Sequence, residues 1–427
     1  LKDLEDKIPG GKYLNIYESI STVRDFGDFG PNLSIESSTW SEIDSTNAYI
    51  DALMTGSKWG DADSSTTKTD LNYYFYDDEK IIGEYDGSLL LDEEKAAFLS
   101  AMDDYTSVAN ISFTESSNFE DAHILWAILD DEDSDESLGS AYAPGDGVYK
   151  GLTTINYYPY TTEENELVDE NILLPGSYYY TTFIHELGHA LGLSHPHPDD
   201  HEIEHFPGVS HDEDSGDNGL NAQPYTVMTY NDVSANKYVP GEEEHFSDSL
   251  YPDGAYVGYM ENLGAFDIAA IQHLYGPNLN SNDDDTIWFL DEEVSNGWYC
   301  IWDNGGKDTV SAENAESSVS IDLRNATLEN EVGGGGYISQ IGSEPLGFTI
   351  AYNSTGDCII ENATGSDQDD KLRGNDVNNI LDGGAGDDVL IGKDGDDTYY
   401  VDSKDDRVTE KSGEGVDLIY SLVAIKQ

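Results

Sequence analysis

The residues with the clearest chemical potential lie in one short run, HELGHALGLSH, which begins at His185. His185 and His189 are four residues apart, so on a helix both imidazoles face the same side and can bind one metal ion. Glu186 lies beside them, where its carboxylate can accept a proton from a water molecule that the metal activates. Gly192 lets the helix end sharply, so that His195 can return as a third nitrogen ligand. The spacing predicts a catalytic zinc site with an open fourth position, rather than a core helix that happens to contain histidines.

The charge of the chain limits its partners. Among 427 residues, 19 Lys and Arg stand against 87 Asp and Glu, which gives a formal net charge of −68. Such an anionic surface excludes general affinity for nucleic acid or acidic membranes and favours cations. The apolar runs are shorter than the ~20 residues that cross a bilayer, so we expect no membrane span. Two explanations of the acidity stay open, namely adaptation to high salt and repulsion that bound calcium neutralises.

The first part of the chain mixes helical and extended patterns around the histidines. Residues 92–107 predict a helix in which Phe98, Leu99, Met102 and Tyr105 recur at helical spacing. The apolar run AHILWAIL, residues 122–129, is flanked by acidic residues and predicts a half-buried or edge strand.

Acidic runs and a final helix complete this part. Residues 130–137 and 199–219 are rich in like charges and predict solvated loops on a compact core. Residues 261–276 predict a last helix, which Gly276 and Pro277 end. After Pro277 the helical periodicity disappears, and Gly, Asn and Asp dominate.

A nine-residue repeat occupies the later part of the chain. Four blocks begin at Gly365, Gly374, Gly383 and Gly392, with Asp or Asn at the fifth and sixth places and Leu or Tyr at the eighth. The fixed period and the recurring apolar residue are typical of a calcium-binding parallel β-roll rather than of a flexible Gly/Asp-rich linker. Oxygen ligands in glycine-rich turns suit calcium, which takes six to eight of them.

Several motifs together resemble one family. The pattern H-E-x-x-H-x-x-G-x-x-H, followed by YTVMTY at residues 225–230, resembles the metzincins. The Met228-x-Tyr230 pairing is similar to the serralysins and astacins, and the glycine-rich repeats select the serralysins. Residues 51–60, 106–115 and 266–278 also resemble that family. The resemblance implies an α+β metzincin catalytic domain, residues 1–276, followed by an all-β parallel β-roll (RTX) domain, residues 277–427.

The resemblance also implies roles for the site residues. His185, His189 and His195 would bind one zinc ion, Glu186 would be the general base, and Tyr230 would be a displaceable ligand that stabilises the oxyanion. For Met228, ordinary core packing and a special electronic role both stay open. The strand at 122–129 resembles the upper edge strand of the family, which pairs antiparallel with an extended polypeptide substrate.

The function implied is that of a secreted, extracellular zinc-dependent endopeptidase, which we expect to be a monomer. A non-catalytic calcium-binding adhesion or surface protein with an inactive metzincin domain is the alternative. The intact Glu186 and the three histidines favour the enzyme.

The resemblance implies several structural calcium ions. Two sets of ligands follow from the nonapeptides: Ser366, Gln368, Asp370, Gly383, Ala385 and Asp388, and then Asn375, Val377, Asn379, Gly392, Asp394 and Asp397. The run WDNGGKDT, residues 302–309, is similar to another serralysin calcium turn. Its implied ligands are Asp303, Gly305, Gly306, Asp308, Asn282, Asp284, Thr286, Ile359 and Glu361.

The remaining features are less specific. Cys300 and Cys358 either form a disulfide or remain two buried free thiols. The tail at 406–427 is similar to the start of a further repeat unit, so we expect the natural protein to continue beyond it. A solvated loop is favoured over a second metal site for four further histidines, His197, His201, His205 and His211.

Overall fold

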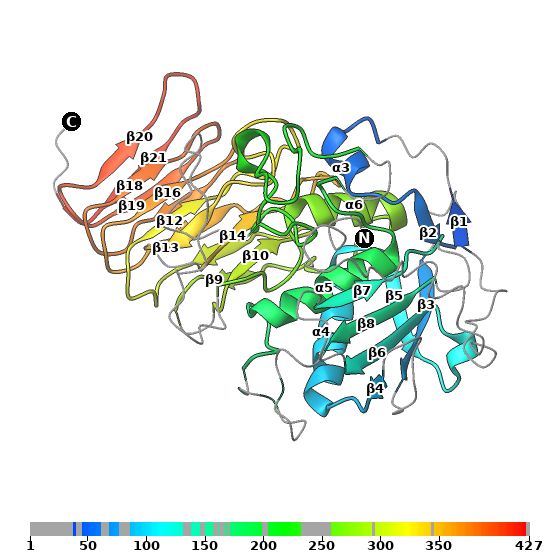
Figure 1. Cartoon of the computed structure of the whole chain (residues 1–427). Helices are drawn as coiled ribbons and strands as arrows, with labels where there is room; N and C mark the ends of the chain where they lie inside the picture. Colours follow the sequence, from blue (N-terminus) through cyan, green and yellow to red (C-terminus); the bar gives the residue numbers. More distant parts are fainter. Residues whose placement is uncertain are drawn as a thin grey trace.

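The computed structural model has a region of helices around one sheet, followed by a region of two stacked sheets (Figure 1). It describes residues 37–39, 45–60, 68–76, 86–130, 138–145, 150–156, 161, 167, 169, 171–198, 204–231, 258–292, 295–342 and 346–423. An α+β region followed by mostly parallel strands agrees with the architecture that the sequence predicts. The acidic run at 130–137 lies outside the described residues, except for its first residue.

The first region is built on a mixed sheet with the strand order β5-β3-β6-β8-β7. Strands β5, β3, β6 and β8 are parallel to their neighbours, whereas β7 is antiparallel to β8 at the edge. A short strand β4 pairs antiparallel with the end of β6, and β1 pairs antiparallel with β2. The bounds are β1 Ser37–Thr39, β2 Ser57–Trp59, β3 Thr69–Tyr76, β4 Asp86–Ser88, β5 Ile111–Glu115, β6 Ile124–Asp130, β7 Gly139–Ala141 and β8 Leu152–Asn156.

Helices α4 (Asp92–Val108) and α5 (Tyr178–Leu191) lie against this sheet (Figure 1). Phe98 of α4 joins the layers, because its ring lies 4.0 Å from that of Trp126 in β6 and 4.7 Å from that of Phe183 in α5. The predicted helix at 92–107 is therefore confirmed to within one residue. Its predicted face is right at Phe98, Met102 and Tyr105, which are at most 2% exposed. It is wrong at Leu99, which is 43% exposed.

Helix α6 (Ala265–Tyr275) is shorter than the predicted helix at 261–276. Gly264 is its N-cap, and the Gly264 N–H donates to Asp267 Oδ2 at 2.8 Å. The residues before Gly264 contact the second region instead of forming helix, since the Glu261 N–H donates to the Trp298 carbonyl. Among the described residues there are also a short helix, α3 (Ala48–Ala52), and 3₁₀ turns at Phe119–Asp121 and Asp217–Gly219.

The predicted loop at 199–219 is a largely solvent-exposed loop in its described part, residues 204–219, but two of its apolar residues are buried. Phe206 is 2% exposed and its ring packs edge-on against Tyr49, 4.8 Å away, and against Phe266, 5.0 Å away. Val209 joins the same cluster. The acidic residues of this segment face solvent while its few apolar residues fasten it to the core.

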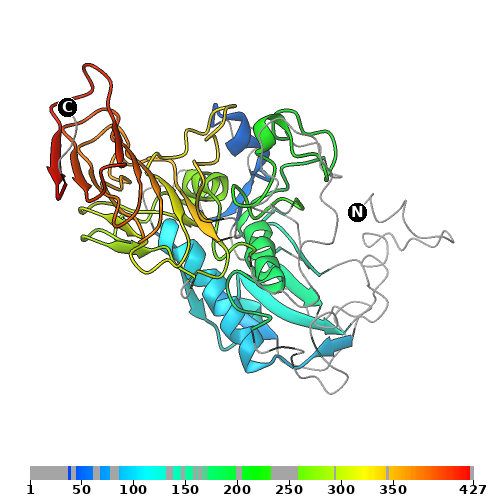
Figure 2. The ribbon, with the colours of Figure 1, turned by 90° about the vertical axis from the view of Figure 1, so that its left-hand side faces the viewer.

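The second region consists of two sheets, with strand orders β10-β14-β13-β12-β16-β18-β20 and β21-β19-β17-β15-β11-β9. From β15 onward, successive strands alternate between the two sheets, and each strand is parallel to the one 18 or 20 residues further along. Figure 2 shows these strands stacked toward the C-terminus. The bounds are β9 Ile287–Phe289, β10 Trp298–Ile301, β11 Thr309–Ser311, β12 Val319–Asp322, β13 Ser339–Ile341, β14 Gly347–Ile350, β15 Asn362–Thr364, β16 Lys371–Arg373, β17 Ile380–Asp382, β18 Val389–Ile391, β19 Thr398–Val401, β20 Arg407–Thr409 and β21 Leu418–Ser421.

The eighth residue of each nonapeptide fills the space between these two sheets. Leu372, Leu381, Leu390 and Tyr399 are all 0% exposed. Leu372 is in register with Leu390, and Leu381 with Tyr399. Burying a side chain of this size contributes roughly 1.5–3 kcal/mol, so the ladder is the main apolar support of the stack.

One hydrophobic cluster runs through both regions, from Tyr49 to Val401. The two regions therefore share one hydrophobic core and do not meet at a polar interface. Among the described residues, no helix is both long and apolar enough to span a membrane.

Candidate metal centre

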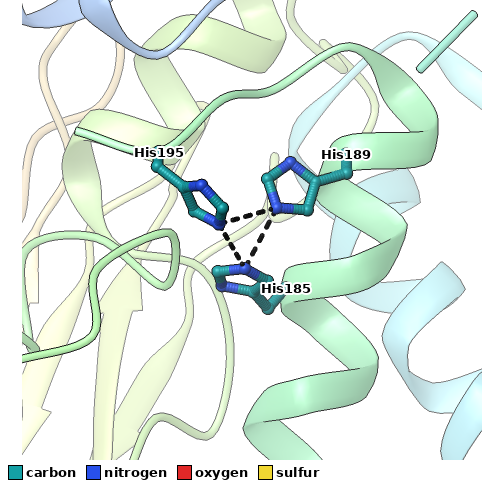
Figure 3. A group of neighbouring side chains, drawn as sticks. All are labelled: His185, His189 and His195. Atoms are coloured by element: carbon teal, nitrogen blue, oxygen red, sulfur yellow. Dashed lines mark hydrogen bonds between the residues drawn. The ribbon is translucent and has the colours of Figure 1, made fainter. Parts of the chain in front are cut away.

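Helix α5 positions the first two histidines of the motif. Ser177 caps the helix, since its hydroxyl oxygen accepts the Tyr180 N–H at 3.1 Å. His185 and His189 are one turn apart, and their Nε2 atoms lie 3.1 Å from each other. The two rings thus point at one place beside the helix, as Figure 3 shows.

The third histidine returns because the helix ends at Gly192. This residue has a φ of 106°, and a Cβ there would collide with the Ser57 carbonyl, so glycine is required. The chain then turns back and places His195 Nε2 at 3.1 Å from His185 Nε2 and 3.0 Å from His189 Nε2. The structure therefore brings the three predicted ligands together (Figure 3).

Hydrogen bonds fix the tautomers of two of these rings. His185 Nδ1 donates to the Val227 carbonyl at 2.8 Å, and His189 Nδ1 donates to the Leu193 carbonyl at 3.0 Å. Each Nε2 then carries a lone pair rather than a proton. Burial, together with the neighbouring imidazoles, holds the pKa of His185 well below its usual value, which keeps this ring neutral. A neutral imidazole with a free Nε2 is the form that binds a metal ion.

The turn at residues 226–228 packs against helix α5 next to the histidine cluster. Met228 is fully buried, and its sulfur lies against Gly188, where a Cβ would come within 2.8 Å of it. Asp267 of α6 holds this turn: its carboxylate accepts Thr226 Oγ1–H at 2.6 Å, Val227 N–H at 2.7 Å and Gly264 N–H at 2.8 Å. Burial raises the pKa of Asp267 to about 7, although the three hydrogen bonds favour its charged form.

Asp267 therefore acts on the histidine cluster through one residue, because the Val227 carbonyl is the acceptor of His185 Nδ1. Sequence reasoning did not assign Asp267 a role. The signal available was an acidic residue in an otherwise apolar helix, where burial requires partners.

Glu186 is almost fully buried next to the histidines, with 6% exposure. Burial raises the pKa of its carboxyl group to about 8. Within the described part of the chain, Glu186 Oε2 accepts no hydrogen bond. Gly139 of β7 lies against this side chain, since a Cβ at Gly139 would be 2.9 Å from Glu186 Cγ and 3.1 Å from Oε1.

Tyr230 approaches the cluster from the solvent side. Its hydroxyl lies 3.0 Å from His195 Nε2, and the residue is 57% exposed. His197 forms a wall behind both side chains: its ring stacks on that of His195 at 4.8 Å and lies 4.6 Å from that of Tyr230. The expectation that His197 belongs to a solvated loop is wrong, because this residue is 3% exposed.

The predicted edge strand is also wrong. Strand β6, which contains the apolar run, lies inside the sheet between β3 and β8, and Ile124, Trp126 and Ile128 are at most 1% exposed. The acidic flanks that suggested an edge belong to its connections. The edge beside Glu186 is β7, a three-residue strand antiparallel to β8. A strand of three small residues has no hydrophobic pattern from which it could be predicted.

The carboxylates around the 302–309 turn meet inside the protein. Asp303 and Asp308 are 0% exposed, and within the described residues each has one oxygen, Oδ2, without a hydrogen bond. Their other oxygens accept the N–H groups of Gly305 and Thr286. Burial and neighbouring carboxylates raise the pKa of Asp303 to about 7 and that of Asp308 to about 6. Glu361 joins them by accepting the Asp308 N–H at 2.8 Å.

The other residues predicted around this turn lie on the adjoining backbone. The Asn282 carbonyl accepts the Asn304 N–H, and Thr286 Oγ1 donates to the Asp284 carbonyl. Gly306 passes so close to Asp284 that a Cβ would collide with that residue's carbonyl group. The Ile359 N–H donates to the Asp357 carbonyl.

The nonapeptide turns stack with a constant hydrogen bond between sixth places. The Asp370 N–H donates to Asp388 Oδ1 at 2.9 Å, and the Asn379 N–H donates to Asp397 Oδ1 at 2.7 Å. Gly383 lies against the Asp388 carboxylate, which a Cβ would overlap. Burial raises the pKa of Asp388 to about 7.

The second and fourth places of the earlier turns make hydrogen bonds through both backbone and side-chain atoms. The Ser366 carbonyl accepts the Ala385 N–H at 3.2 Å. The Gln368 N–H donates to Ser366 Oγ, and the Val377 N–H donates to Asn375 Oδ1. Gly392 lies against the Asp397 carboxylate, and Asp394 occupies the same turn.

The cysteines and the remaining histidines take no part in the cluster. Cys300 and Cys358 are buried free thiols, so of the two alternatives the structure agrees with free thiols and not with a disulfide. Among the described residues, His205 and His211 belong to no group of side chains with metal-binding spacing. His201 lies outside the described residues.

Comparison with known proteins gives one match to a family. A sequence model of the matrixin family matches residues 68–200, which include the three histidines and Glu186. This segment covers most of the first sheet together with helices α4 and α5.

The chain is also similar to several curated proteins. It is 28% identical to "Metallopeptidase AprA" of Pseudomonas marginalis over 339 residues, which cover 74% of this chain and 65% of that protein. It is 29% identical to "Serralysin" of Photorhabdus sp. (strain Az29), over 71% of this chain and 60% of that protein. A "Serralysin" of Proteus mirabilis is 27% identical over 79% of this chain and 68% of that protein. The chain thus spans about two thirds or less of the length of these relatives.

Proposed function

The chain resembles the serralysin-type metzincins, and from this resemblance and the geometry of the histidine cluster we propose that it is a zinc-dependent endopeptidase. The observation that carries the proposal is the convergence of three imidazole Nε2 atoms, 3.0–3.1 Å apart, beside a buried glutamate. We also propose that it is a secreted, extracellular monomer that hydrolyses peptide bonds in proteins.

The donor set fits zinc. Three ligands at about 2.05 Å in a tetrahedral site would be about 3.3 Å apart, close to the distances between the histidine nitrogens. The tautomers fixed by Val227 and Leu193 leave one lone pair on His185 and one on His189. His185, His189 and His195 would hold the ion, with Tyr230 as a displaceable fourth protein ligand. When bound, zinc lowers the pKa of a water molecule and polarises the scissile carbonyl.

Glu186 is the general base in this mechanism. Its carboxylate accepts the proton of the attacking water and delivers it to the leaving amine. Burial removes competing solvent from this carboxylate, and within the described part of the chain its Oε2 accepts no hydrogen bond, so a lone pair remains for the proton of the water.

Tyr230 stabilises the oxyanion. Its hydroxyl lies 3.0 Å from His195 Nε2, and its exposure lets the ring move when substrate arrives. A phenol that donates a hydrogen bond to the developing negative charge acts mainly in the transition state.

Strand β7 offers the place for an extended substrate. It is the edge of the sheet beside Glu186, so a polypeptide could add to it as an antiparallel strand. Main-chain pairing depends little on side chains, and we therefore propose a broad specificity.

The second region is, in this proposal, a calcium-binding parallel β-roll (RTX) domain that begins at residue 277 and follows a catalytic domain of residues 1–276. The buried carboxylates of Asp303 and Asp308, together with Glu361, support it, because ionised groups in such a place need a cation. The calcium ligands are those that the resemblance implies around this turn and in the nonapeptides.

Casein hydrolysis and zinc content test the enzymatic proposal together. Glu186→Gln should bind one zinc ion per chain and lose at least 10²-fold in kcat, because the amide cannot accept a proton. His189→Ala should lose both zinc and activity. Glu120→Gln, an exposed glutamate on the same chain, is the matched control and should behave as the wild type. A wild-type chain that binds zinc but releases no peptides would support the non-catalytic adhesion or surface protein instead.

A further inference from the structure

We propose that a cavity between the two regions binds an organic cation, namely a guanidinium or primary ammonium group on an aliphatic stem. The cavity has a volume of about 340 Å³. Helix α4 and the segments that precede α5 and α6 line it from one side, and β9, β10 and Ser295 line it from the other. Its size lies in the range of small-ligand sites, which often occur where two regions meet. The proposal does not depend on protease activity.

Two carboxylates line the cavity, Asp104 of α4 and Glu261, which precedes α6. Hydrogen bonds fix one oxygen of each. Asp104 Oδ2 accepts the Tyr180 hydroxyl at 2.8 Å, and Glu261 Oε1 accepts the N–H groups of Asn296 and Gly297, both at 2.7 Å. Within the described part of the chain, Asp104 Oδ1 and Glu261 Oε2 accept no hydrogen bond, and neither acid forms an ion pair with a described Lys or Arg. The carboxylates are thus held in position and keep acceptor oxygens for a ligand.

The charge of these two acids favours a cation in the cavity. Burial raises the pKa of Asp104 well above its usual value, and repulsion from Asp103 and Glu261 adds to this shift. Burial raises the pKa of Glu261 as well. A positive group that meets both carboxylates stabilises their ionised forms and removes the repulsion between them. The cavity therefore prefers a cationic occupant to a neutral or anionic one.

The walls of the cavity decide between a metal ion and an organic cation. Ile287 and Phe289 of β9 are 57% and 44% exposed, so apolar surface stays open beside the carboxylates. Trp288 and Tyr299 add aromatic surface. Calcium takes six to eight oxygen ligands, whereas a guanidinium group is weakly hydrated, pairs with carboxylates and packs on aromatic rings. Two carboxylates among aromatic and aliphatic side chains suit the organic cation.

Two polar groups in the wall add a requirement for the stem of the ligand. Ser295 is 6% exposed, and among the described residues its hydroxyl has no hydrogen-bond partner. The same holds for the indole N–H of Trp288. Both groups can donate, so they match a ligand with an acceptor oxygen on its stem. An arginine or lysine residue of a polypeptide combines the cation, the aliphatic stem and a carbonyl. We therefore expect a peptide-borne cation to bind more tightly than a free one.

Titration calorimetry with butylguanidine tests the cavity in the full chain, with Glu186→Gln as the parent so that no proteolysis intervenes. Butylurea has the same shape without the charge and is the ligand control. Asp104→Asn and Glu261→Gln keep an acceptor oxygen for the hydrogen bonds of the fold but remove charge, and each should weaken binding about tenfold or more. Asp103→Asn is the matched control, because this exposed acid is adjacent to Asp104 but does not line the cavity. It should bind butylguanidine as the parent does.

Two blocked tripeptides separate the two sources of the cation. Acetyl-Gly-Arg-Gly-amide should bind more tightly than butylguanidine, and the same peptide with citrulline in place of arginine should not bind. A peptide that binds no more tightly than butylguanidine would overturn the peptide-borne source and assign the cavity to a free organic cation.

Melting temperatures guard against loss of fold in the variants. Without ligand, Asp104→Asn and Glu261→Gln should melt at the parental temperature or higher, because less like charge remains. Butylguanidine should raise the melting temperature of the parent and of Asp103→Asn more than that of these two variants. Equal binding by all three variants would reveal attraction to the acidic surface in general and would overturn the site. Failure of the parent to bind, or equal binding of butylurea, would overturn it as well.

Discussion

The hydrogen bonds that Asp267 accepts should control the zinc affinity of the histidine cluster. Its carboxylate receives three donors, from Thr226, Val227 and Gly264, all at 2.6–2.8 Å. Asp267→Ala removes the acceptor and leaves these buried donors unsatisfied. At about 1–2 kcal/mol for each donor, the free energy of unfolding should fall by about 3–6 kcal/mol.

The same change should weaken zinc binding more than stability alone explains. The Val227 carbonyl orients His185 through its Nδ1, and loss of such an outer partner typically costs 10–100-fold in metal affinity. Asp267→Asn should be milder, because its amide oxygen can still accept the Val227 and Gly264 N–H groups that now share Oδ2. Only the Thr226 hydroxyl then lacks its present acceptor.

Competition with a chromophoric chelator measures the zinc affinity, and urea unfolding of the zinc-free protein measures stability, both in the Glu186→Gln background. Leu381→Ala is the control, since it removes a fully buried side chain far from the histidines and should cost about 2–5 kcal/mol without changing zinc affinity. If Asp267→Ala bound zinc as tightly as its parent, the link through Val227 would be refuted.

Three further perturbations test the proposed chemistry. Tyr230→Phe should lower kcat for a peptide substrate by about 10–100-fold with little change in KM, and an equal effect on both would contradict a transition-state role. Gly139→Ala should retain zinc but lower kcat roughly tenfold, because the new Cβ would lie 2.9 Å from both Glu186 Cγ and the Thr154 carbonyl oxygen, so that Glu186 or strand β7 must shift; unchanged kinetics would contradict a dependence of the rate on the position of this carboxylate. Removing calcium from the Glu186→Gln protein should reduce its strand signal in circular dichroism and its melting temperature, and a protein that does not respond would contradict the proposed roll.

The histidine cluster could be predicted because its geometry is local. The four-residue spacing on a helix sets His185 and His189, and a glycine that ends the helix returns His195 within a few residues. The nonapeptide register is local in the same sense, so Leu372, Leu381 and Leu390 could be placed inside the stack from their period alone.

The features that could not be predicted depend on contacts distant in sequence. Strand β6 is an inner strand because β3 and β8 pair with it, whereas the acidic residues that flank it in sequence predicted an edge strand. His197 is buried because Tyr230 and His195 enclose it, although its neighbours in sequence are acidic. Asp267 acquires its role only when α6 packs below the turn at Val227.

The two regions are coupled through the turn that supports the histidines. Tyr225 directly precedes that turn, and its ring lies on the backbone of Gly335, where a Cβ would come within 2.6 Å of it. Nearby, Asn330 exchanges hydrogen bonds with Asn218 and Asp217 at 2.8 and 2.9 Å. The hydrophobic cluster continues from this contact into the stacked sheets. Unfolding of the stacked sheets would therefore remove packing next to Tyr225, two residues before Val227, whose carbonyl accepts the hydrogen bond from His185. The order of the second region is therefore part of what holds the first histidine in place.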